Sequence, residues 1–378
     1  MRIAVNARLL LKNKLDGIGW YTYQTLKRIT TSHPEHEFIL LFDRKFDDDF
    51  IFSDNITPVV IRPPSRHPFL WIIWFEWSVR RIIKKIKPDL FVSMDGFLCL
   101  STDIPSVVII HDLSFLHRPK DLPLFNSLYY RFFFPRFAEK AVFLGTVSEY
   151  SKNDIINSLG IDDGRIVVVY NGAHELYKPV SEEIKSMTRE KYTNGSPYFI
   201  FVGSIHPRKN LVNLLKAFGI FRSEMSDFKL IIVGQKLFRV PGLYRTHSNM
   251  VNKHDVIFTG RMGQEELPLL MASAEALVYI PFFEGFGIPL VEAMYSEIPI
   301  LASDRTAVPE IVGDAALITN PYDIEDIAKK MVRIVKDYPL RKRLIDAGKE
   351  RRKLYNWDLS AEKLWLLIMD ALKISKYA

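Results

Sequence analysis

The sequence predicts an α/β protein built from two doubly wound domains with parallel sheets. Short apolar runs rich in β-branched and aromatic residues alternate with helical patterns along the whole chain, which is typical of βαβ units. The length of 378 residues is enough for two or three hydrophobic cores. With 48% hydrophobic and 25% charged residues, the composition is that of an ordinary globular protein and excludes a disordered or fibrous one.

The strand-like runs fall into two series. The first series predicts strands at 2–5, 37–42, 58–61, 90–93, 107–110, 142–147 and 166–170, with helices such as 20–29 and 69–86 between them. The second series predicts strands at 198–202, 230–233, 256–259, 276–279, 299–302 and 316–318. Turn residues and a proline in 171–179 indicate a hinge, so we expect one domain at 1–177 and a second at 178–355.

The tail, 356–378, carries a strong helical pattern with no strand after it. We therefore expect a C-terminal helix that packs across the domains. Two such domains facing each other would bring the carboxyl ends of both sheets to one cleft, where open α/β sheets bind their ligands.

Charge and cysteine content limit the classes of function. The 51 basic and 44 acidic side chains give a net charge of +7, but the cations are spread over the chain and form no polybasic domain, so we expect no nucleic-acid partner. The single Cys99 excludes a disulfide scaffold and favours a reducing compartment. The first residues do not resemble a signal peptide and no apolar run is long enough to span a bilayer, so we expect a cytoplasmic protein with at most peripheral contact at the inner face of an anionic membrane.

The local exception in charge follows an aromatic run. Residues 71–77 contain three tryptophans, and the cations Arg80, Arg81, Lys84, Lys85 and Lys87 come directly after them. A helix of this kind either lies in a membrane interface or buries its aromatic rings in the core and leaves its charges in water. The sequence leaves both interpretations open for 69–87.

The most informative motif is 282–294, Phe-Phe-Glu-Gly-Phe-Gly-Ile-Pro-Leu-Val-Glu-Ala-Met. A strand ends just before it, and its proline stands where a helix would begin, so free amides of a helix N-terminus are expected here. Glu284 precedes this helix and Glu292 lies one turn into it, and carboxylates accept paired hydrogen bonds from vicinal hydroxyls. An acidic, solvated helix start is the alternative.

Three further segments place chemical groups at strand ends. Arg208 and Lys209 precede a helix that we expect to begin at Leu211. Cations beside a helix N-terminus suit a pyrophosphate, and a solvated pair of charges is the alternative. His111 lies at the end of a buried strand. It is either a catalytic residue or a structural residue that caps the strand by hydrogen bonding. The glycine loop around Gly17 and Gly19 allows a ligand to approach the backbone, although a simple turn explains it equally well.

Metal motifs are weak. The D-x-D in 47–49 lies among surface-like residues and is interpreted as a solvated loop. The nine histidines show no zinc-like spacing, so we expect no metal site and no cofactor.

Together these motifs resemble the retaining nucleotide-sugar glycosyltransferases of family four, group 1, which have the GT-B architecture of two facing Rossmann-like domains. The resemblance covers nearly the whole chain, and its most specific element is the E-x7-E motif from Glu284 to Glu292. It also implies that the tail helix of 356–378 returns to the N-terminal domain.

The resemblance implies a role for each motif. Glu292 would bind the ribose hydroxyls, Glu284 the donor sugar, and His111 the transferring sugar near its reacting carbon. Lys209 and Arg208 would neutralise the diphosphate, although many members carry an arginine where this chain has Ser204. The remaining expected donor contacts are the glycine loop of the first domain and backbone groups of the second: Gly17, Ile18, Gly19, Phe286, Gly287, Ile288, Arg261 and Met262.

The implied reaction is metal-independent transfer with retention at the anomeric carbon, to a glycan or glycolipid acceptor. The segments 5–8 and 17–22 look most like mannosyltransferases that build bacterial surface polysaccharide, so GDP-mannose is the preferred donor and UDP-sugars are the alternative. An epimerase or phosphorylase of the same fold, or a non-catalytic nucleotide-binding protein, are the other hypotheses.

Overall fold

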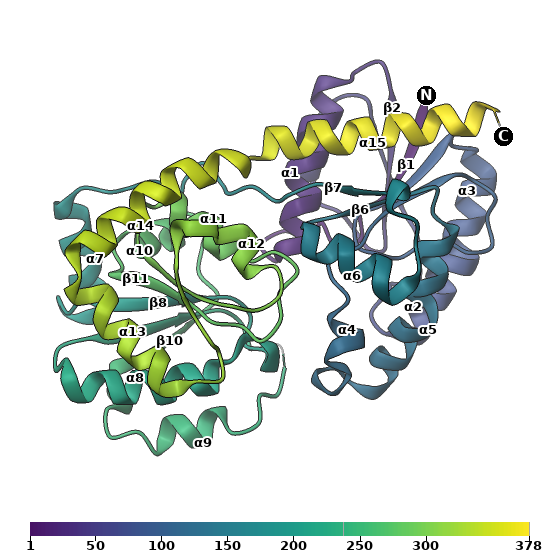
Figure 1. The fold of residues 1–378 in the computed structure, drawn as a ribbon. Helices are drawn as coiled ribbons and strands as arrows, with labels where there is room; N and C mark the ends of the chain where they lie inside the picture. Colours follow the sequence, from purple (N-terminus) through teal and green to yellow (C-terminus); the bar gives the residue numbers. More distant parts are fainter. Residues whose placement is uncertain (237, 378) are drawn as a thin grey trace. The chain divides into compact units, whose positions relative to one another are not determined.

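The computed structural model describes residues 1–236 and 238–377, which form two compact units (Figure 1). The first unit comprises 1–171 and the tail from Asn356 onward, and the second comprises 172–355. The division after Asn171 lies within the turn-rich segment where the sequence places a hinge, a few residues before the boundary expected at 177.

The first unit is built on a parallel seven-stranded sheet with the order β3-β2-β1-β4-β5-β6-β7. The strands are β1 (Arg2–Asn6), β2 (Glu37–Phe42), β3 (Ile56–Val60), β4 (Leu90–Ser93), β5 (Ser106–Ile109), β6 (Phe143–Thr146) and β7 (Ile166–Val168). The central strands are buried on both faces, which explains why they appear in the sequence as continuous apolar runs.

Helices cover this sheet. They are α1 (Gly17–Ser32), α2 (Pro68–Ile72), a π-helical segment Ile73–Val79, α3 (Arg80–Ile86), α4 (Ser114–His117), α5 (Leu124–Lys140), α6 (Glu149–Leu159), α15 (Trp357–Tyr377) and the 3-10 helices Asp48–Phe50, Pro119–Asp121 and Asp163–Arg165. The helix expected over 69–86 is therefore continuous, but its middle is wound as a π-helix.

The second unit repeats the plan with a parallel six-stranded sheet of order β10-β9-β8-β11-β12-β13. Its strands are β8 (Tyr198–Val202), β9 (Lys229–Val233), β10 (Val256–Gly260), β11 (Ala276–Tyr279), β12 (Ile300–Ser303) and β13 (Leu317–Thr319). Its helices are α7 (Glu182–Thr193), α8 (Leu211–Glu224), α9 (Leu243–Ser248), α10 (Glu266–Ala272), α11 (Ile288–Tyr295), α12 (Val308–Val312), α13 (Ile324–Lys336), α14 (Tyr338–Arg351) and the 3-10 helices Pro207–Lys209, Lys253–Asp255, Gly313–Ala315 and Arg352–Leu354. Each strand of both predicted series is present, so the predicted fold class is confirmed.

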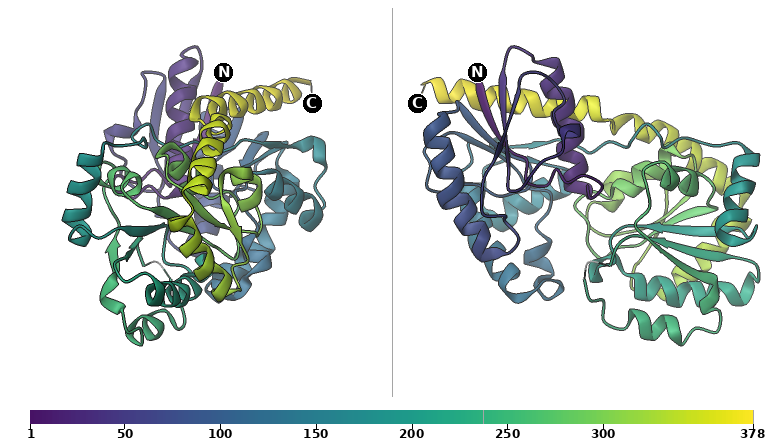
Figure 2. Two further views of the ribbon diagram at one scale, coloured as in Figure 1. Left: turned by 60° about the vertical axis from the view of Figure 1, so that its left-hand side comes forward. Right: turned by 180° about the vertical axis from the view of Figure 1, so that it is seen from behind.

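The C-terminal helix α15 belongs to the first unit and lies beside α1, next to β4, β5 and β6 (Figure 2). The Trp365 indole stacks on the His33 ring with centroids 3.9 Å apart. The Ser360 hydroxyl donates to the carbonyl of Tyr170 at 2.5 Å. These contacts tie the end of the chain to its first domain.

The strand orders decide where ligands bind. In each sheet the order reverses between the first strand and its later neighbour, β1 and β4 in the first unit and β8 and β11 in the second. Ligands of open α/β sheets bind at the carboxyl ends of the strands beside such a reversal. The loops after β1, β4, β8 and β11 are therefore the topological positions of the site.

Candidate active site

The loops after β8 and β11 bring three charged side chains together in the second unit. The Arg208 guanidinium Nη1 lies 2.6 Å from Glu284 Oε1, and the Lys209 ammonium forms a second ion pair with the same oxygen. Lys209 and Glu284 are both buried. The structure thus brings together three residues that the sequence assigned to donor binding, and two of them neutralise the third.

This arrangement fixes the charge of Glu284. Burial by itself raises the pKa of the Glu284 carboxyl, but the positive charges of Arg208 and Lys209 outweigh burial and lower the pKa to about 2. Glu284 is therefore a carboxylate at neutral pH and accepts hydrogen bonds. The cluster of two cations and one carboxylate keeps one positive charge.

Tyr279, the last residue of β11, completes the cluster. The Lys209 ammonium donates to the Tyr279 hydroxyl at 2.6 Å, and this hydroxyl is hydrogen-bonded in turn to Glu284. Burial and the negative charge of Glu284 raise the pKa of the Tyr279 phenol well above its ordinary value, so the phenol keeps its proton. The sequence analysis missed Tyr279, because a tyrosine inside an apolar strand is normally a core residue.

Backbone contacts hold the two charged loops together. The Phe282 amide donates to the Arg208 carbonyl at 2.8 Å, and the Arg208 guanidinium donates to the Phe283 carbonyl at 2.9 Å. Asn210, at φ +61°, donates from its side-chain amide to the Ile280 carbonyl at 3.0 Å. The position of Lys209 is therefore set by its neighbours on both sides.

Gly203 and Ser204 follow β8 and run beside the end of β9. The Gly203 amide donates to the Val233 carbonyl at 2.9 Å, and a Cβ built on Gly234 would lie 1.9 Å from the Gly203 carbonyl oxygen. Any side chain at Gly234 would therefore displace the Gly203–Ser204 turn. Gly234 is a second residue that the sequence analysis missed.

The loop after β11 then enters α11 through Phe286, Gly287 and Ile288. Gly287 has φ +95°, and a Cβ there would lie 2.8 Å from Leu290 Cδ1, so glycine is required on both counts. Ile288 is the first residue of α11 and Phe286 is buried. The amides expected to bind the donor lie at this helix start.

Glu292, one turn into α11, has a different partner from Glu284. Its half-buried carboxyl is hydrogen-bonded to the Tyr177 hydroxyl. Burial raises the pKa of the Glu292 carboxyl to about 7, and the hydrogen bond with Tyr177 opposes the rise. Tyr177 lies in the predicted hinge segment, and nothing in the sequence pointed to its contact with Glu292.

Arg261 and Met262 follow β10, which neighbours β9. Arg261 is exposed and Met262 is half-buried. Their place beside the carboxyl end of the sheet is compatible with contact to a base, and it is outside the Glu284 cluster.

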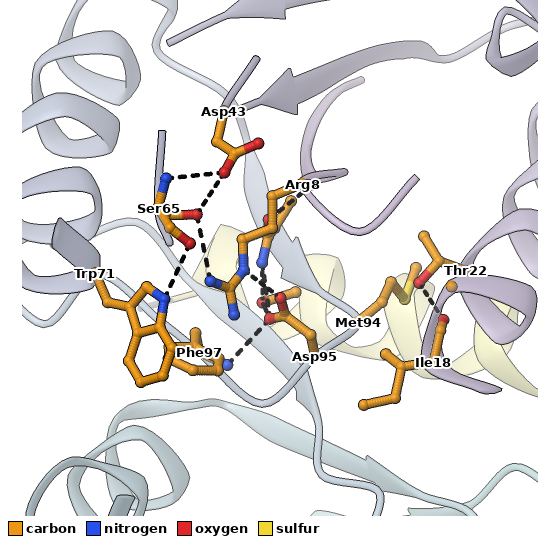
Figure 3. A network of polar contacts seen from close by, with 12 residues as sticks. Arg8, Ile18, Thr22, Asp43, Ser65, Trp71, Met94, Asp95 and Phe97 are labelled. Carbon is orange, nitrogen blue, oxygen red and sulfur yellow. Dashed lines mark hydrogen bonds and ion pairs between the residues drawn. The ribbon is translucent and has the colours of Figure 1, made fainter. Parts of the chain in front are cut away.

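In the first unit, the Gly17–Gly19 segment forms the first turn of α1. The Asp16 carboxylate caps the helix by accepting from the Gly19 amide at 2.9 Å. The Ile18 carbonyl accepts from the Thr22 hydroxyl at 2.8 Å (Figure 3). One of the amides expected to face a phosphate, that of Gly19, is thus already engaged by the cap.

His111 follows β5 and is half-buried. Its Nε2 lies 2.8 Å from the Met94 carbonyl, and its ring contacts the Tyr21 ring edge-on with centroids 5.1 Å apart. Burial lowers the pKa of His111, so the imidazole is neutral at neutral pH. Met94 lies in the loop after β4, which is one of the two loops beside the strand reversal of the first sheet. The hydrogen bond to Met94 therefore places His111 next to that reversal.

The other sequence signals have structural explanations. Asp47 and Asp49 of the D-x-D form ion pairs with the exposed Lys12 at 2.9 and 3.0 Å. Trp71, Trp74 and Phe75 are buried in the core, whereas the five cations that follow are exposed, as is Trp77. Among residues 1–236 and 238–377, no three histidine, cysteine or acidic side chains are grouped so that they could hold a metal ion.

Comparison with known proteins identifies the class. Residues 182–351 match the family model described as glycosyl transferases group 1, and residues 15–175 match that of glycosyltransferase family 4. The structure of HepE from Anabaena in complex with UDP and glucose superposes with a TM-score of 0.77 at 17% identity, covering 98% of this chain and 99% of that one. The fold is therefore GT-B.

Two curated relatives agree with the family models. The chain is 26% identical to O-antigen chain mannosyltransferase B of Escherichia coli over 92% of this chain and 94% of that protein. It is 26% identical to O-antigen chain mannosyltransferase RfbU of Salmonella typhimurium over 71% of each. The chain belongs to the group 1 glycosyltransferases.

Proposed function

We propose that the protein transfers mannose from GDP-mannose to a growing lipid-linked or surface polysaccharide, with retention of configuration and without a metal ion. The observation that carries this proposal is the cluster of Arg208, Lys209 and Glu284 at the strand reversal of the second sheet. Its cations suit a diphosphate and its carboxylate suits sugar hydroxyls. The choice of mannose rests on the relatives whose names are O-antigen mannosyltransferases.

The second unit has a group for each part of the donor. Arg208 and Lys209 neutralise the diphosphate, and the amides of Phe286, Gly287 and Ile288 add hydrogen-bond donors to it. Glu292 accepts from the ribose hydroxyls, and the backbone near Arg261 and Met262 contacts the base. These roles follow from the motif and from the position of each residue at the carboxyl edge of the sheet.

The reaction then rests on positioning and charge stabilisation. The acceptor hydroxyl attacks the anomeric carbon on the face that the nucleotide leaves, and a phosphate oxygen of the donor takes its proton. Glu284 does not serve as a general acid, because a carboxyl with a pKa of about 2 is ionised at neutral pH. It orients the donor sugar instead. The family motif assigns His111 of the first unit to the transferring sugar, near its reacting carbon.

Calorimetric titration of the purified protein with GDP, UDP, ADP and their sugars, in EDTA and then in magnesium, tests the proposal. We expect GDP-mannose to bind most tightly and with the same Kd in both buffers. A preference for UDP-sugars would move the donor to the class found in the HepE complex. Binding that requires magnesium would overturn metal independence, and no binding to any of them would overturn the proposed function.

We also propose that the first unit works at the inner face of an anionic membrane. One face of α5 exposes the adjacent Leu124 (68%) and Phe125 (75%), followed at helical spacing by Leu128 (53%) and Phe132 (53%). Arg131 and Arg136 are exposed on the same face. Large exposed side chains mixed with cations are typical of a helix that lies in a lipid interface.

The opposite side of α5 packs inward, since Tyr130 stacks on Trp71 of α2 at 5.6 Å. The aromatic residues that the sequence suggested for a membrane are thus mostly in the core, and α5 exposes others in their place. No helix in the described parts of the chain combines the length and apolarity needed to cross a bilayer.

Sedimentation with phosphatidylglycerol vesicles and with neutral phosphatidylcholine vesicles tests the membrane contact. We expect binding to the anionic vesicles only, and a loss of at least about tenfold in the Phe125→Ser/Phe132→Ser variant. Val251→Ser removes a fully exposed apolar side chain of the second unit and is the matched control. Equal binding of all three proteins would overturn the contact.

A further inference from the structure

A buried polar network surrounds Asp95, just after β4 in the first unit (Figure 3). Asp95 Oδ1 accepts from the Asn6 amide at 2.8 Å, from the Ser93 hydroxyl at 3.1 Å and from the Phe97 backbone amide at 3.4 Å. Asp95 Oδ2 accepts from Arg8 Nε at 2.6 Å. One carboxylate therefore joins the loop after β1 to the loop after β4.

Arg8 is as deeply buried as its partner, and the two side chains are 7% and 4% exposed. Its guanidinium lies 4.1 Å from the centre of the Phe97 ring, and its Nη1 lies 3.4 Å from the Ser65 hydroxyl. Because arginine stays protonated in proteins, this is a true buried ion pair. A buried ion pair is weak evidence for stability, and such groups can be retained because they specify one conformation.

The hydrogen bonds of Asp95 also restrain the backbone at Met94. Ser93 and Phe97, on either side, both donate to the Asp95 carboxylate, so the intervening backbone is restrained. The Met94 carbonyl is the partner of His111 Nε2 at 2.8 Å. A carbonyl oxygen only accepts hydrogen bonds, so the hydrogen of the neutral imidazole is on Nε2 and the lone pair is on Nδ1.

We propose that Asp95, paired with Arg8, is a positioning residue that holds the Met94 carbonyl against His111 and so locks His111 in the Nε2–H tautomer, with Nδ1 as the hydrogen-bond acceptor for a sugar hydroxyl. The sugar contact rests on the proposed function. The tautomer lock rests on the contacts of the first unit alone. An experiment can therefore contradict the sugar contact without contradicting the tautomer lock, and the reverse is also true.

The first test is nitrogen NMR of the full-length protein with labelled histidine, with the His111 signals assigned through His111→Asn. We expect one Nε2–H tautomer for wild type and a mixture of tautomers for Asp95→Asn. The side-chain amide that Asp95→Asn introduces must place its NH2 group against one set of donors, either Arg8 or Asn6 with Ser93, and the loop then shifts. An unchanged His111 tautomer in Asp95→Asn would overturn the lock.

Asp255→Asn is the matched control for loss of stability. Asp255 pairs with Arg222 and Lys229 at 2.5 and 2.6 Å in the second unit and is also largely buried. We expect Asp255→Asn to leave the His111 signals unchanged. The same tautomer mixture in both variants would mean a general loosening of the protein and would also overturn the lock.

The second test is rescue and kinetics. Arg8→Gln/Asp95→Asn replaces the ion pair by two neutral amides that can hydrogen-bond, and we expect it to recover the single tautomer. Hydrolysis of GDP-mannose should lose at least about tenfold in kcat in Asp95→Asn, with the donor KM within about twofold of wild type, because the group that is displaced acts on the reacting sugar. A change in KM with kcat intact would overturn the positioning role, whereas absence of any donor binding by wild type would instead overturn the proposed function.

Discussion

Glu284 and Glu292 are the same side chain eight residues apart, yet near neutral pH the first is fully ionised and the second is only partly ionised. Two cations lower the pKa of Glu284 to about 2, whereas burial beside the Tyr177 phenol raises the pKa of Glu292 to about 7. The difference comes from the partners that tertiary structure brings to each, because neither set of partners is adjacent in sequence. A motif of two glutamates therefore contains one permanent anion and one group that titrates in the physiological range.

The largest expected effect comes from removing the permanent anion. Glu284→Gln leaves Arg208 and Lys209 close together without a counter-charge, and we expect the free energy of unfolding to fall by about 3–5 kcal/mol in urea titrations. Glu297 is the matched control, since it also pairs with two cations, Lys349 and Arg352, but its side chain is 22% exposed against 7% for Glu284. Glu297→Gln should cost no more than about 1 kcal/mol. Equal losses in the two variants would mean that the Glu284 cluster is no tighter than a surface pair.

The titrating glutamate predicts a pH dependence of stability. The pKa of Glu292 is raised from 4.5 to about 7 by folding, so the folded state binds more protons and stability falls as pH rises from 4.5 through 7. Glu292→Gln removes this loss, and we expect the variant to be more stable than wild type by about 3 kcal/mol at pH 8 and equal to it within about 0.5 kcal/mol at pH 4.5. Denaturant titrations at the two pH values measure the difference. A constant difference would contradict the raised pKa.

The same group predicts how nucleotide binding depends on pH. An ionised carboxylate accepts from both ribose hydroxyls, so affinity should rise about tenfold between pH 6 and pH 8 in wild type. Glu292→Gln should bind weakly and with no such rise. Calorimetry at the two pH values distinguishes these outcomes, and a rise that survives in the variant would assign the titration to another group.

The smallest expected effect concerns the hydroxyl that links the permanent anion to its cation. Tyr279→Phe removes the acceptor of the Lys209 hydrogen bond, and we expect nucleotide diphosphate binding to weaken by about 1 kcal/mol, or roughly fivefold. Tyr198→Phe is the control, because its buried hydroxyl donates to the Leu270 carbonyl at 2.7 Å, away from the cluster. If both variants bind alike, Tyr279 has no part in orienting Lys209.

Much of the fold could be predicted because parallel strands buried on both faces leave continuous apolar runs in the sequence. The candidate site was predictable as far as it consists of loops that directly follow such strands, as Arg208 and Lys209 follow β8 and Glu284 follows β11. Tyr279, Tyr177 and Gly234 were not predictable, since each looks like an ordinary strand, hinge or turn residue until its partner is known. The exposed face of α5 was also missed, because the local sequence does not show which of its many apolar side chains the core covers.

The sequence by itself determined the two sheets, the order of their elements and the residues at the strand ends, because backbone periodicity and turn chemistry are local. Only the tertiary structure decided the charge of each glutamate, the tautomer of His111 and which apolar side chains remain outside. These properties depend on burial and on partners far along the chain, such as Asp95 for Arg8 and Tyr177 for Glu292. The local sequence specifies which strand or loop carries a side chain. The surrounding fold specifies the ionisation state, the tautomer and the burial of that side chain.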